Sequence, residues 1–96
     1  MNQATRSIAE PDAQVLLALH EHTTALDGAV VSNIDVRELA RRMGLRSATV
    51  GAACARLLTV GVLDRIGEPT QGTIPVYAVS ALGAEFVATR KAARRG

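Results

Sequence analysis

The sequence predicts a small α+β fold that is mainly helical and carries one β-hairpin. Apolar residues recur at helical spacing through most of residues 10–60, with start and stop signals around each run. The spacing then changes to that of short strands, and it returns to that of a helix after Ser80. Since 96 residues suffice for one hydrophobic core, we expect a flexible N-terminus over residues 1–9 and a single domain over residues 10–96.

The composition is that of a globular protein, with 48% hydrophobic and 21% charged residues. The longest apolar runs are about five residues, against the roughly 20 that a membrane span needs, and the N-terminus has no signal-peptide pattern. We therefore expect a cytoplasmic protein without a membrane partner.

Residues that could carry catalysis or hold a metal are few. The single cysteine, Cys54, falls on an apolar stripe, and His20 and His22 are two apart, whereas a helical metal pair is spaced by four. The chain has no phosphate-binding loop, no nucleophile elbow and no converging set of acids with a base. We expect neither an enzyme nor a bound metal or cofactor.

The first helix is expected to begin at Glu10-Pro11-Asp12, because proline and acidic residues favour a first turn. Its apolar stripe predicts a helix of about 15 residues that ends at Asp27-Gly28. This stripe consists of Val15, Leu16, Leu19, Thr23 and Leu26. Residues 29–32 predict a short strand at the edge of a sheet.

The next start signal is sharper. Asp35 and Glu38 have the spacing of a capping box, and Ile34 and Leu39 have that of a hydrophobic staple. Gly44 is placed to end this helix of about eight residues. The inward side is expected to hold Val36, Leu39, Ala40 and Met43, with Arg37, Arg41 and Arg42 pointing away.

A third helix is expected over residues 47–60, with Ser47 as its cap and Gly61 directly after its end. Its inward residues are Val50, Cys54, Leu57 and Leu58. Two helices joined by a turn that contains glycine form a helix-turn-helix motif, whose second helix can enter the major groove of DNA.

Two strands, over residues 62–66 and 74–79, are expected to form a hairpin around a loop at residues 67–73. Pro75 favours an edge position. Ser80 is expected to cap a last helix that contains Leu82, Phe86 and Val87 and ends in a basic run.

Charge is distributed unevenly along the chain. Residues 1–40 carry two basic and six acidic groups, whereas residues 41–96 carry nine basic and three acidic groups. This asymmetry favours a surface that faces a polyanion.

The segments DVRELARRMGL and RSATVGAACARLLTVGVLDRI resemble the helix-turn-helix of the MarR, ArsR and PadR-type bacterial regulators. The matching positions are Leu39-Ala40, Gly44-Leu45, Thr49-Val50, Cys54, Leu57 and Gly61-Val62-Leu63, and later Tyr77, Val79, Ser80 and Gly83. The resemblance implies a winged helix-turn-helix fold, binding to double-stranded DNA and a homodimer. Two departures concern Arg46, where those families commonly have serine, and a hairpin tip without arginine or lysine.

The resemblance implies that helix 47–60 lies in the major groove and that hairpin 62–79 lies along the DNA backbone. The expected DNA-binding residues are Arg41, Arg42, Arg46, Ser47, Ala48, Thr49, Ala52, Arg56, Arg65, Thr70 and Gln71. Small side chains would let the helix sit deep in the groove, and the arginines would neutralise phosphates. Ile8, Leu82 and Phe86 are candidates for a dimer surface.

Other interpretations stay open. Alanine is also a good helix former on a solvent-exposed face, and each arginine could simply be solvated. The chain could be a winged-helix module that binds a protein partner, or a protein that binds DNA without regard to sequence, as in plasmid or phage maintenance.

Overall fold

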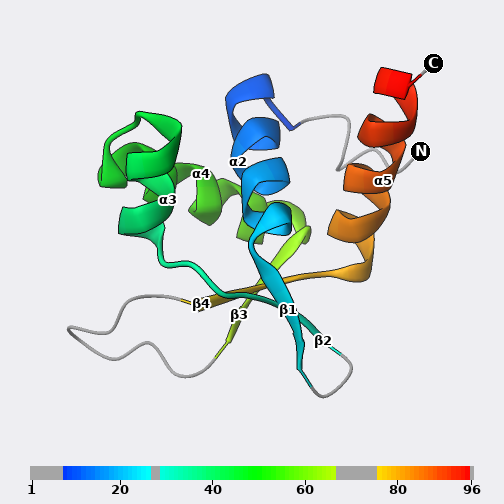
Figure 1. Ribbon diagram of the computed structural model, residues 1–96, viewed down its shortest axis with the longest axis horizontal. Coiled ribbons are helices and arrows are strands. Elements are labelled where there is room, and N and C mark those ends of the chain that lie inside the picture. Colours follow the sequence, from blue (N-terminus) through cyan, green and yellow to red (C-terminus); the bar gives the residue numbers. More distant parts are fainter. Residues whose placement is uncertain (1–7, 27–28, 67–75, 96) are drawn as a thin grey trace.

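The computed structural model describes residues 8–26, 29–66 and 76–95. Within these ranges the elements follow in the order α2 (Glu10–Glu21), β1 (Thr23–Leu26), β2 (Ala29–Ser32), α3 (Val36–Met43), α4 (Ser47–Val60), β3 (Leu63–Ile66), β4 (Val76–Val79) and α5 (Ala81–Arg95). Figure 1 shows the helices on one side of the molecule and the sheet beneath them. The α+β fold class is confirmed.

The first helix begins at Glu10 as predicted but is shorter than predicted. It ends at Glu21, and residues 23–26 form strand β1. The hydroxyl of Thr23 donates to the carbonyl of His20 at 2.9 Å, and the His22 amide donates to the carbonyl of Leu19 at 3.0 Å. Both hydrogen bonds close the helix, so the prediction that Thr23 and Leu26 continue its stripe is wrong.

The four strands form one antiparallel sheet in the order β1-β2-β4-β3. Strand β1 pairs along its whole length with β2, from Thr23 opposite Ser32 to Leu26 opposite Ala29. On its other side β2 pairs with β4 through Val31 and Ala78. The prediction that residues 29–32 form an edge strand is therefore wrong, because β1 occupies that edge.

Helix α3 has the predicted cap. The Asp35 carboxylate accepts a hydrogen bond of 2.8 Å from the Glu38 amide, and Gly44 ends the helix in the left-handed conformation with φ 70°. Leu39 and Ala40 are buried, and Val36 and Met43 pack against the same core.

Helix α4 has the predicted bounds but not the predicted cap. Arg46 occupies the cap position without a capping side chain, and Ser47 is already inside the helix, so the prediction of a Ser47 cap is wrong. The reason is that the backbone is extended at Arg46 and already helical at Ser47. Val50, Ala53, Cys54 and Leu57 are buried, and Gly61 ends the helix with φ 90°.

Strands β3 and β4 form the predicted hairpin, with Leu63 opposite Val79 and Ile66 opposite Val76. The predicted loop at 67–73, together with Ile74 and Pro75, lies outside the described residues. Ser80 starts α5 as predicted: its hydroxyl accepts from the Gly83 amide at 3.1 Å and donates to the Gly61 carbonyl at 2.7 Å.

The core lies between the helices and the sheet. Its largest fully buried side chains are Leu16, Leu19, Leu39, Leu57, Leu63, Val15, Val50, Val62, Val87 and Cys54. They come from α2, α3, α4, β3 and α5 and from the residue before β3, so one core fixes the position of α4 relative to the hairpin. Over the described ranges, none of the helices has the length and apolar character to cross a membrane.

Candidate nucleic-acid interface

The outward face of α4 is lined with small side chains. Ala48, Ala52, Ala55 and Thr59 are exposed and lie on the side opposite the buried stripe. Gly51 is on the same side, and a Cβ added there would meet nothing within 4 Å. A helix with so little side-chain bulk on one side can approach another surface closely.

The first turn of α4 is exposed and lacks negative charge. Arg46, Ser47, Ala48 and Thr49 are all exposed, and the turn contains no acidic residue. Since no side chain of the described residues caps this end and its first turn contains no acidic residue, the positive end of the helix dipole is open to a negatively charged partner. Arg46 adds a full positive charge at the same place.

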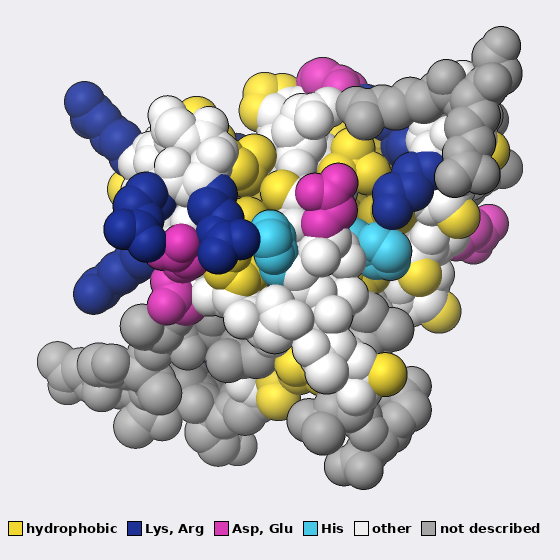
Figure 2. All heavy atoms as spheres, viewed as in Figure 1, with side chains coloured by type: hydrophobic (Ala, Val, Ile, Leu, Met, Phe, Trp, Pro, Cys, Tyr) yellow, Lys and Arg dark blue, Asp and Glu magenta, His cyan; other side chains and the backbone are white. Residues whose placement is uncertain are grey.

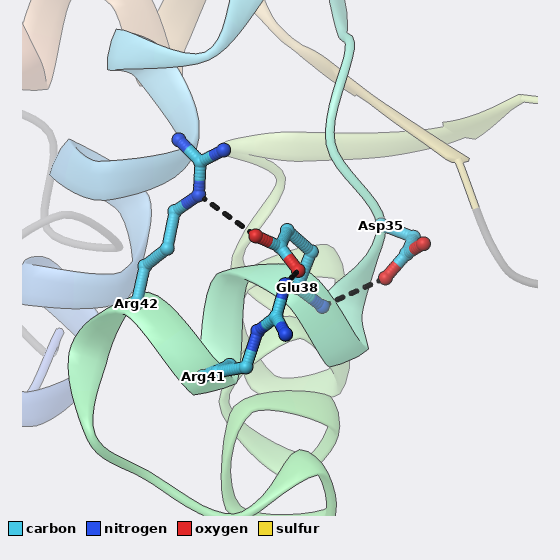
Figure 3. Close-up of polar contacts among 4 residues, drawn as sticks. All are labelled: Asp35, Glu38, Arg41 and Arg42. Atoms are coloured by element: carbon cyan, nitrogen blue, oxygen red, sulfur yellow. Dashed lines mark hydrogen bonds and ion pairs between the residues drawn. The ribbon is translucent and has the colours of Figure 1, made fainter.

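Arg41 and Arg42 lie on the outward side of α3 and converge on one carboxylate (Figure 3). Glu38 pairs with Arg41 three residues on and with Arg42 four residues on, where the Nε–Oε1 distance is 3.1 Å. The hydrogen bond from Arg42, which has the larger effect, and the one from Arg41 hold the pKa of the Glu38 carboxyl below its usual range. Figure 2 shows basic side chains gathered around a carboxylate at this end of the molecule.

Arg56 has a partner within the chain. Its Nε and one terminal nitrogen each donate to Asp12 at 2.8 Å, although the two residues are 44 positions apart. The Asp12 side chain is 7% exposed and that of Arg56 is 59% exposed. The hydrogen bond from Arg56 lowers the pKa of Asp12 against the opposing effect of burial. This pair joins the first turn of α2 to the second half of α4.

An open pocket of about 330 Å³ adjoins this ion pair. Its lining residues are Ile8, Ala9, Asp12, Arg56, Leu57, Thr59 and Val60. The walls are mostly apolar, and the two charges at its edge neutralise each other.

Three predicted DNA-binding residues follow α4 in the sequence: Arg65, Thr70 and Gln71. Arg65 is exposed on β3, opposite Tyr77 in register. Thr70 and Gln71 lie outside the described residues. Arg90 of α5 pairs with Glu10 and lies 5.7 Å from the centre of the Phe86 ring.

The structure leaves Arg46, Ser47, Ala48, Thr49 and Ala52 exposed around the first half of α4, and it leaves Arg41 and Arg42 exposed on the preceding helix. The pairing of Asp12 with Arg56 was not predicted from the sequence, because acidic residues in a first turn are already explained by their effect on the helix dipole. The exposure of Leu45 was not predicted either: this side chain is 42% exposed in the turn between the two helices.

The side chains that could ligate a metal ion or react as a thiol do not form a cluster in the part of the chain that the structure describes. There, no three His, Cys, Asp or Glu side chains lie close enough together to hold a metal ion. Cys54 is fully buried, and burial raises the pKa of its thiol to about 11.

A helix, two paired strands, a helix-turn-helix, a β-hairpin and a closing helix together define a winged helix-turn-helix fold. The solved structures that share this fold include the following two. The Mycobacterium tuberculosis protein RV1404 is 24% identical, with a TM-score of 0.70 over 94% of this chain and 55% of that one. MepR from S. aureus, solved in complex with DNA, is 13% identical, with a TM-score of 0.66 over 88% of this chain and 63% of that one.

The chain thus spans between about half and two thirds of the length of these two proteins. No family model matches the chain, and no curated protein matches its sequence. At these identities the likeness shows the fold.

Proposed function

We propose that this chain binds double-stranded DNA as a transcriptional regulator, with α4 in the major groove and the β3–β4 hairpin along the backbone. The observation that carries the proposal is the outward face of α4, where small side chains run the length of the helix and begin at an exposed Arg46. The similar fold of MepR, which was solved in complex with DNA, supports the same use here.

The shape of α4 suits the groove. B-DNA admits a helix in a major groove about 12 Å wide, and alanine and threonine methyl groups can contact thymine methyls there. Ala48, Thr49 and Ala52 are exposed in the first half of the helix, which is the half that usually contacts base edges in helix-turn-helix proteins. Because this face of α4 has few polar side chains that could contact base edges, we expect DNA shape and half-site spacing to determine much of the sequence preference.

Phosphate contacts would come from around the same end of α4. The uncapped first turn offers backbone N–H groups, and Arg46 offers a guanidinium. Arg41 and Arg42 lie on α3, and Arg65 lies on the hairpin. We expect Arg56 to contribute less to phosphate binding, because two of its hydrogen-bond donors are already used by the buried Asp12.

We further propose that two copies bind two half-sites, as is usual for helix-turn-helix proteins. Ile8, Leu82 and Phe86 are only partly covered by the core and are the candidate contacts between copies. Sedimentation of the protein with and without its DNA site would count the copies.

A protein-binding role is the second candidate. It is favoured by the pairing of Arg41, Arg42, Arg56 and Arg90 with acids of the same chain, which reduces the charge free for DNA.

The test begins with selection of duplexes from a random-sequence pool, followed by anisotropy titrations at about 50 and 200 mM salt, a range over which phosphate contacts weaken strongly. Arg46→Ala should weaken binding several-fold and reduce the salt slope by about one. The matched control is Lys91→Ala, which removes one exposed positive charge from α5, on the opposite side of the molecule from α3 in Figure 1.

Absence of binding at the lower salt concentration would refute the proposal and favour the protein partner. Equal losses for the two variants would show that only net charge matters. Equal affinity for selected and scrambled duplexes would instead identify a sequence-neutral DNA-binding protein.

A further inference from the structure

One acidic side chain stands among the basic residues of the helix-turn-helix. The Glu38 carboxylate uses one oxygen for Arg41 and the other for Arg42, so it engages both guanidinium groups at once (Figure 3). Both arginines were expected to contact phosphate. The carboxylate occupies donors that a DNA phosphate would otherwise take.

The exposures of the three side chains show how firmly this cluster is held. Glu38 is 30% exposed, whereas Arg42 is 54% and Arg41 is 77% exposed. An ion pair open to water is weak and exchanges partners easily. A phosphate that reaches α3 could therefore take over one guanidinium without disturbing the core, but it has to compete with Glu38.

We propose that Glu38 is a positioning residue that holds Arg41 and Arg42 as an internal substitute for a phosphate and so keeps DNA affinity below what these arginines could give. The inference rests on the proposed DNA-binding function. Because the carboxyl remains ionised throughout the neutral range, Glu38 acts as a constant restraint on affinity and not as a pH switch.

A purely structural role for Glu38 makes a different prediction. Ion pairs at i,i+3 and i,i+4 stabilise helices slightly, and an acid near the start of α3 also complements its dipole. On that account alone, loss of the carboxylate would lower stability and leave DNA affinity unchanged or reduced. On the present proposal the same change raises affinity, so the sign of the effect separates the two.

The experiment measures DNA affinity and its salt dependence for Glu38→Gln, on a duplex that the wild-type chain binds. Released arginines should tighten binding about three- to tenfold at the lower salt concentration and steepen the salt slope by about one. The control is Glu85→Gln, which removes one exposed negative charge from α5. Melting curves establish that both variants fold, and Glu38→Ala provides a second variant without the amide.

A mutant cycle gives the sharper result. In an Arg41→Ala, Arg42→Ala background, Glu38→Gln should change affinity less than twofold, because no guanidinium remains to be released. An unchanged or weaker affinity for Glu38→Gln in the otherwise native chain overturns the proposal. A gain that equals that of Glu85→Gln, or that survives in the double-alanine background, also overturns it. If the wild-type chain binds no duplex at all, the proposed function itself fails, and that result is seen before any variant is compared.

Discussion

Gly83 lies where α5 crosses the start of the hairpin, and replacement by alanine should damage the fold even though alanine is the better helix former. A Cβ built on Gly83 would lie 2.2 Å from the carbonyl oxygen of Val62 and 3.0 Å from a methyl carbon of Val79. The first of these contacts is with backbone, so no side-chain rotation relieves it. Either α5 or the chain at Val62 must move.

The expected cost follows from three contributions. Insertion of a methyl group into a packed site costs about 1–3 kcal/mol. The Val62 carbonyl also accepts a 3.1 Å hydrogen bond from the Ser80 amide, and its displacement costs about 1 kcal/mol. Against these, alanine gains about 1 kcal/mol in helix propensity over glycine. The net loss is about 1–3 kcal/mol, which lowers the melting temperature by about 4–24 °C for a domain of this size.

Gly51 provides the matched control, because it lies inside α4 and a Cβ there meets nothing within 4 Å. Gly51→Ala should therefore gain the higher helix propensity of alanine without a steric clash of the new Cβ, and it should melt about 4–8 °C higher than the wild type. Thermal unfolding followed by circular dichroism measures both variants. A melting temperature of Gly83→Ala at or above that of the wild type would refute the predicted clash.

Two further predictions concern buried ionisable groups. Since Arg56 lowers the pKa of Asp12, whose ordinary value is 3.8, the pair stabilises the fold above that pH and the stabilisation is lost as the pH falls through the lower folded-state value. The difference in unfolding free energy between wild type and Asp12→Asn, from urea denaturation, should shrink toward acid pH, and a difference independent of pH would contradict this. Cys54 is fully buried with a pKa of about 11, so an aromatic disulfide reagent at mildly alkaline pH should modify it much faster in urea than in buffer. A native rate equal to that of free cysteine would show that the thiol is accessible.

The sequence predicted α3 and α4 well because their ends carry local signals. Asp35, Gly44 and Gly61 each act on neighbouring backbone, so spacing alone identifies them. The end of α2 was missed because Thr23 and Leu26 fit a helical stripe as well as a strand, and pairing with residues 29–32 decides between the two. The local spacing of apolar residues does not reveal that pairing, because it depends on residues of another segment.

In the candidate site too, features that depend on neighbouring residues could be predicted from the sequence, and a contact between distant residues could not. Exposure of Ala48, Thr49 and Ala52 followed from helical periodicity once α4 was placed. The partner of Arg56 could not be predicted, since it lies 44 residues away and depends on how α2 packs against α4. Arg46 occupies the cap position that was predicted for Ser47, because the backbone is extended at Arg46 and helical from Ser47 onward.

The pairing of Val31 with Ala78 bears on the order in which the chain assembles. Hairpin β1–β2 and the contact between α3 and α4 form between neighbours in sequence, but the pairing of β2 with β4 closes a loop that contains the whole helix-turn-helix. Closure of a long loop costs entropy, and it costs less when the intervening chain is already compact. We therefore expect α3 and α4 to dock first and β4 to pair with β2 late. The β3–β4 hairpin would then reach its final position only after α4 is in place.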